Sequence, residues 1–182
     1  MNEKESAMKN KFGILVPVMI ILLLALAGCG SISEKNSNQR IENISQIKIN
    51  DLLKYKDSYV GDNAAVGNII SRLPANTYKS GFSLQTKKEP YGITVNYMEN
   101  LSLGTNDYNN FWDGRDIEEF LEKNAVVALA LIKNADFIEF KVAGINQGSY
   151  KYTRKYLEQK YDGDLRNISK DATSFKKFVN NE

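Results

Sequence analysis

The sequence contains no histidine, a single cysteine and only 3 prolines among its 182 residues. Histidine is the most frequent general acid or base near neutral pH and the most frequent zinc ligand. Its absence therefore excludes histidine-based triads and His/Cys zinc sites. One cysteine cannot form an internal disulfide. These absences exclude several classes of enzyme and of disulfide-stapled protein, and they leave the activity open.

The sequence also lacks an excess of charge of either sign. It has 24 Lys and Arg residues against 22 Asp and Glu residues, a formal net charge of +2, and no basic tract. A protein that grips nucleic acid needs a concentration of positive charge to neutralise phosphates. We therefore expect no nucleic-acid partner.

The N-terminus does contain a targeting pattern. Three lysines precede an uncharged, largely apolar stretch at residues 12–27. A membrane-spanning helix needs about 20 apolar residues, whereas a positive segment followed by a shorter apolar one is typical of a signal peptide. The stretch ends in Leu26-Ala27-Gly28-Cys29, which is similar to the lipobox of bacterial lipoproteins. Residues 1–28 are therefore predicted to be a lipoprotein signal peptide.

Cleavage before Cys29 makes this residue the N-terminus, with a thiol that can carry a diacylglyceryl group. Lipidation also explains a lone thiol in an exported protein, and two acyl chains, palmitate among them, anchor a protein stably. An uncleaved membrane helix is the alternative, because the uncharged run extends to Ser33 and could span if tilted. We expect an extracytoplasmic protein anchored to the cell membrane by lipid on Cys29, with no other cofactor.

The rest of the chain divides into a tether and one domain. Residues 29–44 follow the cleavage site and are rich in Ser, Asn and charged side chains, which predicts a flexible tether. Residues 45–182 suffice for one core without disulfides. They are predicted to form a single α+β domain, a small antiparallel or mixed sheet with helices packed on one face.

Hydrophobic periodicity predicts the elements of this domain. Helices are expected within 45–60 and over 63–73, 117–132, 152–161 and 169–179, and strands over 82–87, 93–97 and 136–142. Asp62 and Asp113 are expected N-caps. The sequence Glu89-Pro90-Tyr91-Gly92 predicts a type I turn with a glycine bulge, closing a hairpin. Residues 99–114 are Asn-rich and predict a long loop.

Four blocks in this region resemble a bacterial family known as domain of unknown function 4825. They are KYKDSYVGDNAAVGNIISRLP, LQTKKEPYGITVNY, NAVVALALIKNADFIEFKV and YTRKYLEQKYDGDLRNISKD, within about residues 50–175. The resemblance implies a secreted lipoprotein of Gram-positive bacteria, sometimes found beside or fused to antirepressor-like membrane metallopeptidases. It implies a sensing role in the envelope. The zinc motif of those metallopeptidases is absent, so their chemistry does not carry over.

Two groups of residues are candidate contacts for a ligand or partner. Tyr59, Asp62 and Asn63 could form a binding edge at a helix N-terminus, although capping alone accounts for Asp62. Tyr91 lies in the second family-like block. Trp112 could stack on a sugar or peptide, although an aromatic that pins its loop to the core is the simpler interpretation.

No pattern points to catalysis or to a bound metal. A calcium loop starting at Asp107 fails because Trp112 occupies the position that requires glycine. Carboxylates gather at Glu118, Glu119 and Glu122, and again at Asp162 and Asp164, but no nucleophile or phosphate loop accompanies them. We expect them to lie on a solvated helix face and in a turn.

The sequence therefore favours a non-catalytic binding or sensory lipoprotein. Its expected partners are the membrane, through the lipid, and an envelope or membrane protein. A carboxylate-based hydrolase of wall or peptide substrates is one alternative. A homodimer formed through residues 125–132, AVVALALI, is another, because this helical segment is apolar on every side and is either buried in the core or free to bind.

Overall fold

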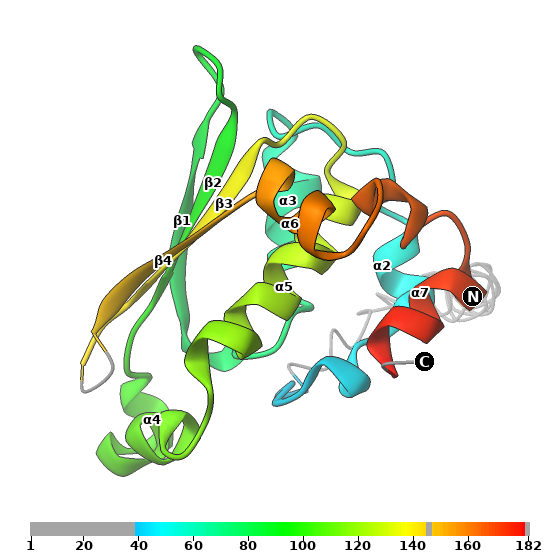
Figure 1. Ribbon diagram of the computed structural model, residues 1–182. Helices are drawn as coiled ribbons and strands as arrows, with labels where there is room; N and C mark the ends of the chain where they lie inside the picture. Colours follow the sequence, from blue (N-terminus) through cyan, green and yellow to red (C-terminus); the bar gives the residue numbers. More distant parts are fainter. Residues whose placement is uncertain (1–38, 145–146, 181–182) are drawn as a thin grey trace, which may run out of the picture. The chain divides into compact units, whose positions relative to one another are not determined.

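The structure is a computed structural model that describes residues 39–144 and 147–180 (Figure 1). The predicted signal peptide, Cys29 and residues 30–38 lie outside the described residues. The domain starts earlier than the sequence suggested, because Ile41 is buried and its amide donates to Asn76 Oδ1 at 3.0 Å. Residues 39–44, which the sequence suggested as tether, therefore belong to the packed domain.

Four strands form one mixed sheet in the order β1-β2-β3-β4. They are β1 (Lys79–Gln85), β2 (Gly92–Tyr97), β3 (Phe137–Val142) and β4 (Gly148–Thr153). The pairs β1/β2 and β3/β4 are antiparallel, as expected for strands joined by short connections, and β2/β3 is parallel. Two helices fill the β2–β3 crossover. The predicted α+β class is confirmed, with a mixed sheet.

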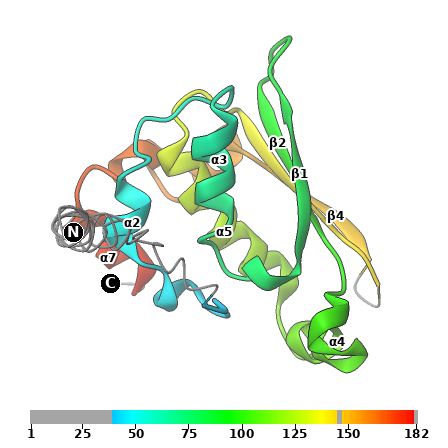
Figure 2. The ribbon, with the colours of Figure 1, turned by 180° about the vertical axis from the view of Figure 1, so that it is seen from behind.

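The helices gather on one face of this sheet, as Figures 1 and 2 show from opposite sides. They are α2 (Ile49–Leu53), α3 (Asn63–Ile70), α4 (Thr105–Trp112), α5 (Ile117–Leu131), α6 (Arg154–Lys160) and α7 (Ala172–Val179), with single 3-10 turns η1 (Ile44–Gln46), η2 (Asn76–Tyr78), η3 (Leu101–Leu103) and η4 (Leu165–Asn167). α5 is the central helix and packs on β3 and β4.

The second half of α5 forms the centre of the core. Every residue from Asn124 to Ile132 is at most 2% exposed. The apolar segment 125–132 is therefore buried against the sheet and the other helices, and it leaves no apolar face for a second copy of the chain. Burial of such a segment on all sides explains why its hydrophobicity shows no polar stripe.

Several local predictions are confirmed. The hairpin pairs Phe82 with Val95 and Leu84 with Ile93, so these apolar residues share the inner face. Asp62 caps α3, with its carboxylate accepting from the Ala65 amide at 2.9 Å. The predicted turn is wrong. The hairpin loop spans residues 86–91 with a cis Glu89–Pro90 bond, and the register shift lies between Lys79 and Gly81.

The predicted loop over 99–114 is wrong, because it contains η3 and α4. Tyr108, Phe111 and Trp112 are buried at helical spacing, so packing of this aromatic face outweighs the low helix propensity of the asparagines. The N-cap of α5 is Asp116, not Asp113, and Asp116 Oδ1 accepts from the Glu119 amide at 3.0 Å.

The strand β4 was not predicted. Residues 152 and 153 were assigned to a helix, yet Tyr152 pairs with Ile138 in the sheet. The helix starts only at Arg154, where the Thr153 hydroxyl caps it by accepting from the Tyr156 amide at 3.2 Å. Thr153 therefore ends the strand and starts the helix.

Candidate functional site

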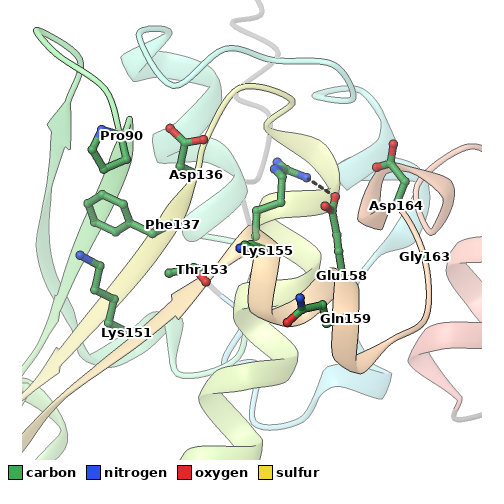
Figure 3. Close-up of a pocket in the computed structure, with 11 residues that line it drawn as sticks. Pro90, Asp136, Phe137, Lys151, Thr153, Lys155, Glu158, Gln159, Gly163 and Asp164 are labelled. Carbon is green, nitrogen blue, oxygen red and sulfur yellow. Dashed lines mark ion pairs between the residues drawn. The ribbon is translucent and has the colours of Figure 1, made fainter.

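A pocket of about 710 Å³ lies where the hairpin loop approaches the junction of β4 and α6 (Figure 3). Its walls come from the start of β3, the end of β4, α6 and the turn before η4. The lining residues are Pro90, Asp136, Phe137, Lys151, Thr153, Arg154, Lys155, Glu158, Gln159, Gly163 and Asp164. This binding-site candidate is called the β4–α6 pocket below.

The apolar part of the pocket is built around one glycine. The Phe137 ring lies over Gly92 on the neighbouring strand, and a Cβ atom on Gly92 would come within 2.1 Å of that ring. Only glycine therefore allows Phe137 to lie across the sheet. The Lys151 ammonium then stands 3.9 Å from the centre of the Phe137 ring, a favourable cation–π arrangement.

Arg154 is the residue that joins the pocket to the central helix. Its guanidinium donates to the carbonyl oxygens of Leu129, Ile132 and Ala135 at 2.8, 2.9 and 2.9 Å. These carbonyls lie at and beyond the end of α5, where helical partners run out. Burial lowers the pKa of Arg154 below its ordinary value. The side chain thus joins the start of α6 to the end of the central helix.

The carboxylates around the pocket are engaged by neighbouring groups. Asp136 Oδ2 accepts from the Tyr91 amide at 2.6 Å. Glu158 Oε1 lies 3.6 Å from Arg154 Nη1, and Figure 3 draws this ion pair. Asp164 pairs with Arg166 at 2.7 Å, and hydrogen bonding to Arg166 lowers the pKa of its carboxyl.

Two lysines of the pocket, in contrast, have no acidic partner within hydrogen-bond distance among the residues that the structure describes. Lys151 contacts the Phe137 ring, and Lys155 is exposed on the first turn of α6. Glu158 and Asp164 are paired with arginines, and Asp136 is bonded to a backbone amide. The cations that a ligand in the pocket could reach are therefore Lys151 and Lys155. The arrangement suits an anionic group held above an apolar floor.

A second groove, of about 680 Å³, carries the predicted carboxylate group of α5. Glu122 is only 5% exposed and accepts from Lys160 Nζ at 2.9 Å and from the Tyr161 hydroxyl at 3.0 Å. Glu119 pairs with Lys123 at 2.8 Å. Glu122 thus ties α5 to the end of α6, and its burial contradicts the solvated helix face that the sequence predicted for it. The Glu119–Lys123 pair lies within α5. Both acids have basic partners, so they do not form a free acid and base pair.

The candidate contacts named from the sequence lie apart. Trp112 is 2% exposed and packs edge-on against Phe111 and Phe120, so it faces the core. Asp62 is used as a cap. Tyr59 is 55% exposed under the Lys133 ammonium, 4.1 Å from the ring centre.

The two remaining candidates lie on separate elements. Asn63 is exposed at the first position of α3. Tyr91 reaches the β4–α6 pocket indirectly, because its amide holds Asp136. Among the described pockets, none is lined by any of the five candidates.

The sequence could not identify Lys151 as a pocket residue, because β4 was not predicted. Lys155 falls in the predicted helix 152–161, but nothing in the sequence places it beside Lys151 and Phe137. Alternation along Gly148–Thr153 places Lys151 on the outer face, in register with Glu139, and that alternation was the one available signal. Within residues 39–144 and 147–180, no group of acidic or sulfur ligands is arranged to hold a metal ion. The same residues contain no helix of the length and hydrophobicity that a membrane crossing requires.

Comparison with known proteins adds a family. Residues 52–153 match the family described as a domain of unknown function, DUF4825. The matched segment runs from α2 to the end of β4 and includes all four strands and the central helix. Searches of curated proteins and of solved structures find no match to this chain.

Proposed function

We propose that this protein, which belongs to the DUF4825 family, is a lipid-anchored extracytoplasmic lipoprotein that acts as a non-catalytic binding or sensory module of the bacterial envelope. One observation carries the anchoring: Leu26-Ala27-Gly28-Cys29 directly follows a short apolar run with a positive flank. A lipid on Cys29 accounts for that pattern and for the presence of a single thiol.

The binding role is supported by the β4–α6 pocket. It combines a concave surface, an apolar floor at Phe137 and two lysines that form no ion pair among the described residues. The ligand that fits this chemistry carries an anionic group, a carboxylate or a phosphate, next to an apolar or planar part. Binding without catalysis is favoured because the surrounding carboxylates are engaged in hydrogen bonds and ion pairs.

The anchoring proposal is tested by processing in bacterial cells. Cys29→Ala removes the lipid acceptor, and the lipoprotein signal peptidase inhibitor globomycin blocks cleavage of the native chain. We expect the native chain to shift to its precursor size under globomycin, and Cys29→Ala to lose lipid labelling. Ser33→Ala, four residues away, is the matched control and should be processed normally. Normal processing and lipid labelling of Cys29→Ala would overturn the proposal.

The pocket proposal is tested by titrating the lipidated protein in detergent with inorganic phosphate and with a short N-acetylated amino acid as a carboxylate probe. Binding should be weakened at least severalfold in the Lys151→Ala/Lys155→Ala double variant. Lys177→Ala removes an exposed lysine of α7 and should leave binding unchanged. Equal loss in both variants would indicate general charge attraction instead of a site.

A further inference from the structure

A short segment after β2 exposes three large apolar side chains. Met98, Leu101 and Leu103 are 51%, 82% and 42% exposed. Within the part of the chain that the structure describes, the other large hydrophobic residues with comparable exposure are Tyr59 and Tyr156, on separate elements. The cluster of Met98, Leu101 and Leu103 is called the apolar ridge below. Such a concentration of exposed aliphatic side chains is typical of an interaction surface.

The ridge is held in place by hydrogen bonds. Asn100 Nδ2 donates to the Thr77 carbonyl at 3.0 Å, and Asn100 Oδ1 accepts from the Ser102 amide at 3.2 Å. The Met98 amide donates to the Tyr78 carbonyl at 3.0 Å. The leucines therefore project from a fixed turn, η3, and their exposure follows from the fold of this segment.

The ridge lies beside the point where the described chain begins. Asn76 Nδ2 donates to the carbonyl of Gln39 at 3.1 Å, while the next residue, Thr77, accepts from Asn100. Arg40 reinforces this junction by pairing with Asp107 of α4 at 2.7 Å. Gln39 and Asn100 are thus bonded to two consecutive residues of η2, so the start of the described chain lies near Leu101.

Chain length sets how far this end of the domain can lie from the lipid. Nine residues, 30–38, separate Cys29 from Gln39. Whatever their conformation, they span at most about 35 Å when fully extended. If Cys29 carries the lipid, as proposed above, the chain holds Gln39, and with it the side of the domain that bears the ridge, within about this distance of the bilayer.

The surroundings of the ridge favour a lipid surface over an anionic patch or a charged protein. No lysine or arginine occurs between residues 98 and 114. Arg40, the nearby cation, is already paired with Glu42 and Asp107, both at 2.7 Å. Attraction to anionic headgroups therefore contributes little here, and burial of aliphatic side chains in the interface is the remaining driving force.

From these observations we infer that Met98, Leu101 and Leu103 insert into the interfacial layer of the membrane that holds the lipid anchor. This inference rests on the proposed function, because it needs the lipid on Cys29. Insertion fixes the orientation of the domain. The hairpin loop lies at the opposite end of the sheet from α4 and η3 (Figures 1 and 2), so the β4–α6 pocket faces away from the membrane.

The test uses the full lipidated chain in vesicles of phosphatidylcholine. Cys29 is the only cysteine and is occupied by lipid, so Ser102→Cys supplies a unique thiol for an environment-sensitive fluorophore between the two leucines. Lys88→Cys in the hairpin loop is the matched control site. We expect a blue-shifted emission at residue 102, several-fold weaker quenching by aqueous iodide than at residue 88, and quenching by lipids that carry a nitroxide near the headgroup.

A second variant separates the leucines from the label. Adding Leu101→Gln and Leu103→Gln to Ser102→Cys should raise iodide quenching to the level of residue 88. Trp112 is the single tryptophan and is buried in the core. Its fluorescence emission therefore reports whether this variant keeps its native packing. The result should not depend on salt or on the fraction of anionic lipid.

Equal iodide quenching at residues 102 and 88 would overturn the inference. So would shielding that survives the leucine substitutions, or shielding that appears only when other membrane proteins are added, which would indicate a protein partner. Vesicle flotation measures separately whether the lipid anchor attaches the chain to the membrane. A chain that floats but stays exposed at residue 102 contradicts only the ridge, whereas a chain that does not float contradicts the anchor and, with it, this inference.

Discussion

The two ends of the sheet use charge in opposite ways. At the ridge end, formed by Arg40, η2, η3 and α4, the cation Arg40 is paired with Glu42 and Asp107 and the exposed large apolar side chains are aliphatic. At the pocket end, the acids are engaged, and Lys151 and Lys155 form no ion pair among the described residues. One fold therefore presents exposed aliphatic side chains at one end and a concave surface with two exposed lysines at the other.

The ridge end also differs in how it is built. Asp107 accepts two hydrogen bonds from Arg40 Nη1, at 2.7 and 2.8 Å, and one from the Tyr78 hydroxyl at 2.5 Å. The Arg40 guanidinium lies 5.4 Å from the Tyr78 ring centre. Polar bonds thus lock the first described residues to a buried aromatic cluster, while the apolar ridge stays outside it. The pocket end depends instead on Arg154 and on backbone carbonyls.

The largest expected change in stability distinguishes the buried side chains of the ridge end from its exposed ones. Trp112→Ala removes a side chain that packs against Phe111, Phe120 and Tyr97, and we expect it to lower the free energy of unfolding by about 3–5 kcal/mol. Leu101→Ala, at 82% exposure in the native chain, should change it by less than about 0.5 kcal/mol. Urea unfolding of the lipidated protein in detergent measures both. Equal losses would show that the ridge is part of the core.

The next largest change in stability tests the structural role of Arg154 at the pocket end. Arg154→Met leaves the carbonyl oxygens of Leu129, Ile132 and Ala135 without their donor, and we expect a loss of about 3 kcal/mol in the free energy of unfolding. The neighbouring Lys155→Met should cost less than about 0.5 kcal/mol, because Lys155 is exposed. The same urea experiment applies. A loss below about 1 kcal/mol for Arg154→Met would contradict its structural role.

The smallest expected effect is a pH dependence of stability at the ridge end. Hydrogen bonds from Tyr78 and Arg40 lower the pKa of Asp107 below its ordinary value of 3.8. A lowered folded-state pKa adds stability that is present above the unfolded-state value and is lost as the pH falls through the folded-state value. We therefore expect Asp107→Asn to cost about 1–2 kcal/mol at pH 7, with the difference from the native chain shrinking below about pH 4.

This pH prediction is checked by urea unfolding across the acid range. Asp113→Asn is the matched control, since Asp113 is an exposed acid just after α4. It should follow the native chain at every pH. A difference between Asp107→Asn and the native chain that stays constant down to strong acid would show that the carboxylate charge is not what stabilises this junction.

The parts of the fold that the sequence predicts well are those set by local signals. The periodicity of α5, the cap at Asp62 and the alternation of the hairpin strands each depend on residues within a few positions of one another. The apolar run 125–132 left two alternatives open from sequence alone. Its burial is decided by β3 and β4 packing against it, which no local pattern contains.

The parts that the sequence missed depend on distant partners. α4 forms because Tyr108 and Trp112 pack on Tyr78 and Tyr97, which lie on other elements. β4 forms because it pairs with β3, and this pairing places Lys151 over Phe137. Arg154 acquires its role only when the end of α5 meets the start of α6. The candidate site therefore could not be found before the strand pairing was known.

The most direct test of the account is the mass of the mature N-terminus. The protein is extracted from bacterial membranes, digested, and its N-terminal peptide identified by mass spectrometry. If Cys29 carries the lipid, this peptide begins at Cys29 and has the added mass of a diacylglyceryl group. A membrane-bound chain that still begins at Met1, or a mature chain with an unmodified Cys29 thiol, would contradict it.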